Sequence, residues 1–222
     1  MQSNQLIGLI KFFRNEEFLD KLVNGTFYCT PPEVYRLDEQ KGISDKFESC
    51  NFSYRKSRKD DEIILHINDR RITEHTSLTV RNKADKDSWM HCWFSLRLPQ
   101  NEKSLDQLKL DIVRMKREFG ELFAFIPAPS IAGFLDLIEE LSPLPMVCDE
   151  VEYSADKSHW GSLCKSIDYS YQREFRLLFG ECNTHETEFL VFSDPNKFSN
   201  IILKNPELKI KNKDNSITWL EI

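Results

Sequence analysis

One stretch, residues 171–180 with the sequence YQREFRLLFG, constrains the fold more than any other part of the chain. It is dense in aromatic and aliphatic residues and ends at a glycine, which is typical of a β-strand. Side chains of a strand alternate between its two faces. Gln172, Glu174 and Arg176 would then share one face. That face is either ordinary solvated surface or the floor of a polar site.

The beginning of the chain predicts a strand, a helix and a second strand. Residues 6–13 form an apolar strand with Lys11 inside it. Asn15 suits a helix N-cap, and the two glutamates that follow it suit a first helical turn, where negative charge is stabilised. An Asn-Gly pair ends the helix, and residues 26–30 form the next strand before two prolines.

The rest of the chain completes the pattern of an α+β fold. Residues 31–50 form a long irregular stretch, which in a compact domain is usually functional or mobile. One helix begins at Ser104, in a capping box with Gln107, and a second begins at Ser130. We expect a single α+β domain over residues 1–222, mainly antiparallel, with about three helices. Further strands are predicted at 62–67 and 76–81 (a hairpin), 88–96, 121–126, 146–153, 186–193 and 201–204, and near 208 and 218.

Composition predicts a globular protein of the cytosol. A formal net charge of −6 argues against a general nucleic-acid coat protein, although two basic segments, residues 55–59 and 70–71, could bind phosphate or be solvated loop charge. No apolar run approaches the roughly 18 residues of a membrane span, and the N-terminus lacks a secretory signal. The six cysteines are scattered, so we expect reduced thiols and no metal site.

Several polar residues could converge on one site. The chain has no glycine-rich phosphate loop, no Gly-x-Ser-x-Gly and no His-Glu-x-x-His. The candidates come instead from the first strand, the irregular stretch, the strand at 88–96 and the polar face described above. They are Lys11, Asp45, Glu48, Ser95, Gln172, Glu174 and Arg176.

The chemistry of this set depends on one carboxylate. Glu174 beside Arg176 would stay ionised. An ionised carboxylate among hydrogen-bond donors could stabilise the positive charge that develops on a sugar during glycosidic cleavage. The alternative is that Glu174 and Arg176 form an ion pair with a purely structural role.

Several segments together resemble a bacterial and phage family known as a domain of unknown function. The family pattern Asn-Asp-Pro-Phe-Glu is similar to residues 44–48, Ser-Asp-Lys-Phe-Glu. Its Cys-Phe-Ser strand resembles residues 92–95, and its Tyr-Glu-x-Glu-x-Arg strand resembles residues 171–176. The match extends over residues 10–180, with Lys46 in place of the proline and Gln172 in place of the first glutamate.

A second resemblance, to ADP-ribosyltransferases, implies an activity. Those enzymes have an early basic residue, a serine in a middle strand and a late Gln-x-Glu or Glu-x-Glu. The resemblance implies that Lys11 or Arg14 holds the dinucleotide NAD and that Ser95 braces the site. It further implies that Glu174 is catalytic and that Gln172 orients the acceptor. The early Arg or His of the pattern is not met clearly, because Lys11 departs from it and Arg14 follows the strand.

We therefore expect an NAD-dependent ADP-ribosyltransferase-like enzyme of a bacterial toxin or phage-defence system, with nucleic acid or protein as acceptor. Arg176 completes its predicted cofactor-binding residues. The alternative is a non-catalytic binding or sensor module of a phage-conflict system. Such a module would meet nucleic acid through basic loops near Arg55 and Arg70, or a protein through residues 31–50.

A third hypothesis is a nucleic-acid hydrolase with a divalent ion. Asp45, Glu48 and Glu174 would supply the carboxylates, but the chain shows no spaced metal motif around them. None of the three hypotheses fixes an oligomeric state.

Overall fold

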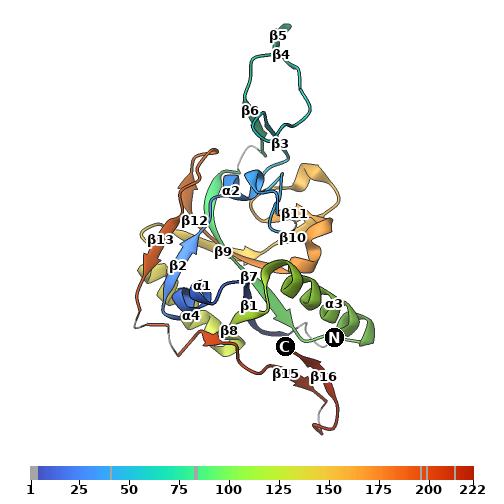
Figure 1. Ribbon diagram of the computed structural model, residues 1–222, viewed down its shortest axis with the longest axis vertical. Coiled ribbons are helices and arrows are strands. Elements are labelled where there is room, and N and C mark those ends of the chain that lie inside the picture. The colour runs from blue at the N-terminus through green and yellow to red at the C-terminus, as the bar shows by residue number, and fades with distance from the viewer. Residues whose placement is uncertain (1–4, 41, 83–84, 196, 199, 213) are drawn as a thin grey trace.

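The computed structural model describes residues 5–40, 42–82, 85–195, 197–198, 200–212 and 214–222. At its centre is a six-stranded sheet in which every neighbouring pair is antiparallel (Figure 1). In spatial order its strands are β14 (Leu203–Lys204), β8 (Leu122–Pro127), β1 (Leu6–Phe13), β7 (Asp87–Arg97), β12 (Glu174–Cys182) and β9 (Met146–Glu150).

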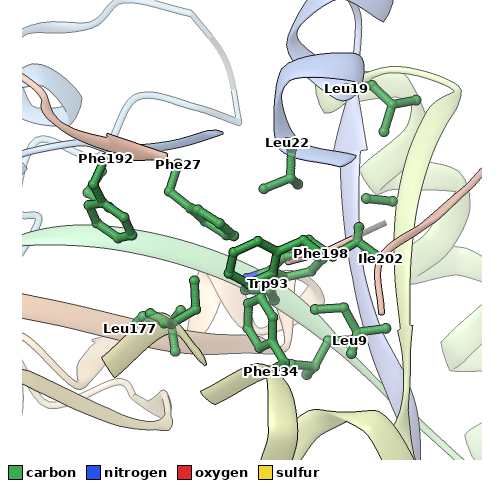
Figure 2. Close-up of a cluster of buried hydrophobic side chains, with 14 of the residues drawn as sticks. Leu9, Leu19, Leu22, Phe27, Trp93, Phe134, Leu177, Phe192, Phe198 and Ile202 are labelled. Atoms are coloured by element: carbon green, nitrogen blue, oxygen red, sulfur yellow. The ribbon is translucent and has the colours of Figure 1, made fainter. Parts of the chain in front are cut away.

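Apolar side chains bury both faces of this sheet. On one face, α1 (Glu16–Val23) and α4 (Ile131–Leu141) pack around Trp93, whose ring centroid lies 5.6 Å from that of Phe134 (Figure 2). On the other face, α3 (Glu102–Phe119) packs with the cluster that contains Phe94. Successive strand residues point to opposite faces, which explains why neighbours on β7 join different clusters. The predicted α+β class with mainly antiparallel strands is confirmed.

The strand β7 has different neighbours along its two halves. Its pairing with β1 ends where Ile10 lies opposite Phe94, although β1 continues along β8 as far as Phe13. The earlier half of β7 instead meets the end of β2 (Thr26–Cys29) through a bridge between Thr30 and Met90. β1 and β2 therefore separate along β7, and the candidate site lies at this separation.

An arm between β2 and β7 projects from the body (Figure 1). β3 (Phe52–Arg55) pairs with β6 (Ser77–Val80), and a separate hairpin of β4 (Leu65–Ile67) and β5 (Arg70–Ile72) lies at the far end. The predicted hairpin of two strands in this region is wrong, because each of those strands pairs with another segment. The pairing of β6 with β3 fixes its register, and the sequence pattern did not indicate this partner.

The remaining elements complete the layers around the sheet. β10 (Glu152–Ser154) and β11 (Cys164–Ser166) pair in parallel. β13 (Leu190–Ser193) pairs with β2, and β15 (Lys209–Lys211) with β16 (Thr218–Glu221), both antiparallel. No helix of the described residues is long and apolar enough to cross a membrane. The other elements are the helix α2 (Pro32–Leu37) and the 3-10 turns η1 (Ala128–Ser130), η2 (Lys157–His159) and η3 (Ile167–Gln172).

Several predicted boundaries are confirmed and others need correction. Asn15 caps α1 by accepting a hydrogen bond from the Glu17 amide, as predicted. The cap of α3 is Asn101 rather than Ser104, because Asn101 Oδ1 accepts from the Ser104 amide while Ser104 Oγ accepts from the Asn101 amide. Residues 31–50 are not wholly irregular, since they contain α2.

The strand predicted at residues 171–180 begins later than expected. Tyr171 and Gln172 belong to η3, and Arg173 has a left-handed backbone with φ of 42°. A residue in this conformation cannot continue a strand, so β12 starts at Glu174. Gln172 therefore does not share a strand face with Glu174 and Arg176.

Candidate functional site

A buried lysine, Lys165, lies among the acidic side chains of the candidate site. Its Nζ lies 2.9 Å from Glu174 Oε1, 3.1 Å from Glu48 Oε2 and 3.6 Å from Asp45 Oδ2. It also donates a 3.0 Å hydrogen bond to Gln172 Oε1. All five side chains are buried. A buried ammonium is stable only when its charge is paired, and here carboxylates supply the pairing.

Arg176 completes a closed ring of charges, which we call the four-charge ring: Glu48, Lys165, Glu174 and Arg176. The Arg176 guanidinium lies 2.7 Å from Glu174 Oε2 and 2.8 Å from Glu48 Oε1. It also donates to the Ser162 carbonyl at 2.6 Å. Each carboxylate thus bridges the same two cations with its two oxygens. The ring fixes the orientation of both carboxylates without leaving a buried charge unpaired.

Local structure explains how residues from distant segments meet here. Glu174 and Arg176 are two positions apart on β12, so they point to the same face. The left-handed Arg173 turns the chain between η3 and β12, which lets Gln172 reach the same cluster. The Gln172 amide also donates to the Gly42 carbonyl at 2.9 Å and so ties the segment after α2 to the site.

The segment that carries Asp45 and Glu48 is held by its own hydrogen bonds. Asp45 Oδ1 accepts from the Phe47 amide at 2.9 Å, which fixes a tight turn. Arg36 on α2 donates from Nε to the Glu48 carbonyl at 2.8 Å and pairs with Asp87 at 2.6 Å. These hydrogen bonds hold Glu48 at the pocket and Asp45 beside Lys165.

The four-charge ring determines how its carboxylates titrate. Burial alone would raise the pKa of Glu174, but Arg176 and Lys165 outweigh it and hold that pKa below its usual range. The same balance lowers the pKa of Glu48. The pKa of Asp45 is raised, because burial is the larger effect there and the attraction of Lys165 does not offset it. The four-charge ring therefore keeps both Glu174 and Glu48 ionised at neutral pH.

The ring forms one side of a pocket of about 400 Å³, the carboxylate pocket. Apolar side chains from three elements form much of the rest of its wall, among them Phe12, Phe18 and Phe119, with Ile43 beside them. The polar side chains that line it include Lys11, Glu48, Lys165, Gln172, Glu174 and Arg176. A pocket with apolar walls and a small set of fixed charged groups has the composition of a small-molecule site.

Lys11 lies where β1 and β2 separate. Its Nζ donates a 2.8 Å hydrogen bond to the Cys92 carbonyl. Burial lowers the pKa of Lys11, and the nearby Glu174 acts in the opposite direction. No carboxylate of the described residues lies within ion-pair distance of it. Lys11 therefore offers a positive charge to an anionic group that enters the pocket.

The structure brings together most, but not all, of the predicted site residues. Lys11, Gln172, Glu174, Arg176 and Glu48 line the carboxylate pocket, and Asp45 contacts it through Lys165. Two predicted cofactor-binding residues, Ser95 and Arg14, do not line it.

Ser95 lies on the opposite face of the sheet from Glu174. It pairs with Leu9, whereas Glu174 pairs with the adjacent β7 residue Phe94, and adjacent strand residues point to opposite faces. Its buried Oγ has no hydrogen-bond partner among the described residues. Arg14 follows β1, where it donates to Gln40 Oε1 at 2.9 Å and to the Glu118 carbonyl. Neither position suits a role in holding a dinucleotide beside Glu174.

Lys165 is the residue that the sequence did not indicate. A lone lysine between Cys164 and Ser166 matches no motif. It occupies the space between Asp45, Glu48 and Glu174 where the hydrolase hypothesis would place a divalent ion. Among the described residues, no group of three His, Cys, Asp or Glu side chains is arranged to hold a metal ion.

Comparison with protein-family models, with curated proteins and with solved structures gave no match to this chain. The class of site is defined by its geometry: a pocket whose wall carries an ionised carboxylate held between two cations.

Proposed function

We propose that this protein is an enzyme that consumes NAD, cleaving the bond between nicotinamide and ribose and transferring ADP-ribose to a nucleic-acid or protein acceptor. One observation carries the proposal: Glu174 is a buried, ionised carboxylate on the wall of a ligand-sized pocket, with Gln172 in the same cluster. The Gln-x-Glu resemblance and the geometry thus lead to the same two residues.

The chemistry needs a fixed negative charge beside the ribose. When the glycosidic bond breaks, its electron pair goes to the pyridinium nitrogen, nicotinamide leaves as a neutral molecule, and positive charge develops on the ribose ring. The acceptor then forms a bond to the same ribose carbon and loses its proton to solvent or a base. Glu174 stabilises the developing charge, and an electrostatic group positioned in advance contributes most when it does not need to reorient.

The ring leaves Glu174 free to engage a ligand. Each of its oxygens has one cation partner, Lys165 or Arg176. A carboxylate has about four acceptor positions, so a ribose hydroxyl can donate to Glu174 while both ion pairs persist. Lys11, at the same pocket, supplies the positive charge for the dinucleotide phosphates.

The proposed setting rests on other observations. The resemblance to a phage and bacterial family supports a toxin or phage-defence role. All six cysteines are free, which fits a reducing compartment such as the cytosol.

A non-catalytic nucleic-acid module is the second candidate, and one observation favours it. Arg70 and Arg71 are exposed on β5 at the far end of the projecting arm (Figure 1). Arg55, by contrast, is buried and donates to both carboxylate oxygens of Glu33 at 2.7 and 2.6 Å. Nucleic acid would therefore contact β5, and replacing Arg70 and Arg71 would weaken salt-dependent oligonucleotide binding.

Blocking the carboxylate pocket tests the proposed function while the four-charge ring is left in place. Ile43→Trp adds a large side chain at the pocket wall, and Leu110→Trp makes the same change on the exposed face of α3. We expect purified protein to release nicotinamide from NAD, Ile43→Trp to lower this rate at least about tenfold, and Leu110→Trp to retain it. Equal rates for all three proteins, or no nicotinamide release by the wild type with DNA, RNA or protein acceptors, would contradict the proposal.

A further inference from the structure

A second pocket meets the first at Lys11, on the face of the sheet that carries α1. We call it the aromatic pocket, and its volume is about 450 Å³. Lys11 and Phe18 line both pockets. The other residues that matter here are Leu22 on α1, Tyr28 on β2, His91 on β7 and Phe189 just before β13.

Three aromatic side chains of this pocket are unusually accessible. Phe18 is 51% exposed, Phe189 51% and Tyr28 39%. Contact between a large aromatic side chain and water is unfavourable. A planar ligand ring that stacks on the side chain removes part of this surface from water and so stabilises the complex. These three come from separate parts of the chain, α1, β2 and the segment before β13, and all of them line the aromatic pocket.

The charge of the aromatic pocket is positive. Among its described lining residues Lys11 is the one charged side chain, and it has no carboxylate within ion-pair distance there. His91 is neutral, because burial and the nearby Lys11 lower its pKa well below the usual value, and its Nδ1 donates to the Tyr28 carbonyl at 3.2 Å. The carboxylate pocket, by contrast, contains Glu48 and Glu174. A ligand in which an anionic group is attached to a planar ring is therefore favoured in the aromatic pocket over the carboxylate pocket.

We infer that the aromatic pocket binds the base of a nucleotide, with Lys11 contacting the phosphate next to it. This inference rests on the proposed function: the ADP half of NAD would occupy the aromatic pocket, and the nicotinamide ribose would reach Glu174 in the carboxylate pocket. Lys11, which lines both pockets, would contact the pyrophosphate that joins the two halves.

Binding of ADP tests this inference without any turnover. Isothermal titration of wild-type protein with ADP should give saturable binding. Phe189→Ala should weaken it about tenfold, since stacking of one base on an aromatic side chain has an effect of this order. Lys11→Met should weaken it by a similar factor, because the phosphate loses its cation.

Matched controls keep the test specific. Val191→Ala truncates another exposed side chain near Phe189, on β13, that does not line the pocket, and it should leave ADP affinity within about twofold of wild type. Inorganic pyrophosphate should compete poorly, because it lacks a base. The inference is overturned if wild type does not bind ADP, if Phe189→Ala and Lys11→Met bind it as wild type does, or if pyrophosphate competes as well as ADP.

The two proposals can fail separately. If ADP binds as described but nicotinamide is never released, the nucleotide pocket stands and the proposed chemistry is wrong. If nicotinamide release depends on the carboxylate pocket but Phe189→Ala and Lys11→Met bind ADP as tightly as wild type, the proposed function stands and this inference is wrong.

Discussion

Lys165 Nζ lies 2.9 Å from Glu174 Oε1, and this pair joins β11 to β12 at the centre of the candidate site. The same ammonium is 3.1 Å from Glu48, whose second oxygen is 2.8 Å from Arg176. The carboxylate on which the proposed chemistry depends is therefore also part of the structural network. The two alternatives for Glu174, a structural ion pair and an active-site group, are therefore combined in one group of residues.

Removal of Lys165 should destabilise the protein strongly. Lys165→Met leaves Glu48, Glu174 and Asp45 with one fewer cation in a buried cluster, and breaking such a network lowers the free energy of unfolding by about 3 to 5 kcal/mol. Urea unfolding at neutral pH measures the change. Lys109→Met, at an exposed position on α3, is the control and should change stability by less than about 0.5 kcal/mol. A loss below about 1 kcal/mol for Lys165→Met would show that the cluster is not paired as described.

The lowered pKa values of Glu48 and Glu174 predict a loss of stability in acid. Their pKa values are below those of an unfolded chain, about 4.3 for glutamate. Their contribution is therefore fully present above about pH 5 and declines as the pH falls and the unfolded state takes up protons first. Asp45, whose pKa is raised, acts in the opposite direction.

The acid dependence can be assigned to Glu174 by substitution. The free energy of urea unfolding, measured between about pH 3 and pH 7, should fall more steeply toward acid for wild type than for Glu174→Gln. Glu139→Gln, at an exposed position on α4, should follow the wild-type curve. Parallel curves for wild type and Glu174→Gln would mean that the pKa of Glu174 is not lowered by folding.

Ser95→Ala should leave the protein as stable as wild type or stabilise it by about 1 kcal/mol. The buried Ser95 hydroxyl has no hydrogen-bond partner among the described residues, and a hydroxyl in that state is unfavourable. Thermal or urea unfolding measures the effect. A destabilisation of more than about 1 kcal/mol would show that Ser95 Oγ has a partner, and the bracing role implied by the resemblance would then regain support.

Local sequence patterns predicted much of the fold. The strand at residues 6–13 and the helix capped by Asn15 depend on neighbouring residues alone, and both are found. The pairing of β3 with β6 depends on contacts between distant segments, which periodicity does not reveal. Arginine has no preference for a left-handed backbone, so the sequence does not indicate the turn at Arg173. The predicted strand therefore starts at residue 171, before the observed start of β12.

The candidate site was predicted only in part for similar reasons. Gln172 and Glu174 were found through a short motif, and both line the carboxylate pocket even though their predicted shared strand face is wrong. Ser95 was misplaced because its face depends on the register with β1. Lys165 carries no motif, and its role is visible only once three acidic segments meet around it.

The rate of nicotinamide release from NAD by wild type and by Glu174→Gln tests the central claim most directly. Both proteins should be assayed at a pH and temperature where unfolding curves show each to be folded, with Glu139→Gln as the matched control. The account predicts that Glu174→Gln lowers the rate about 100-fold or more while Glu139→Gln retains it. Equal rates for Glu174→Gln and wild type would contradict it.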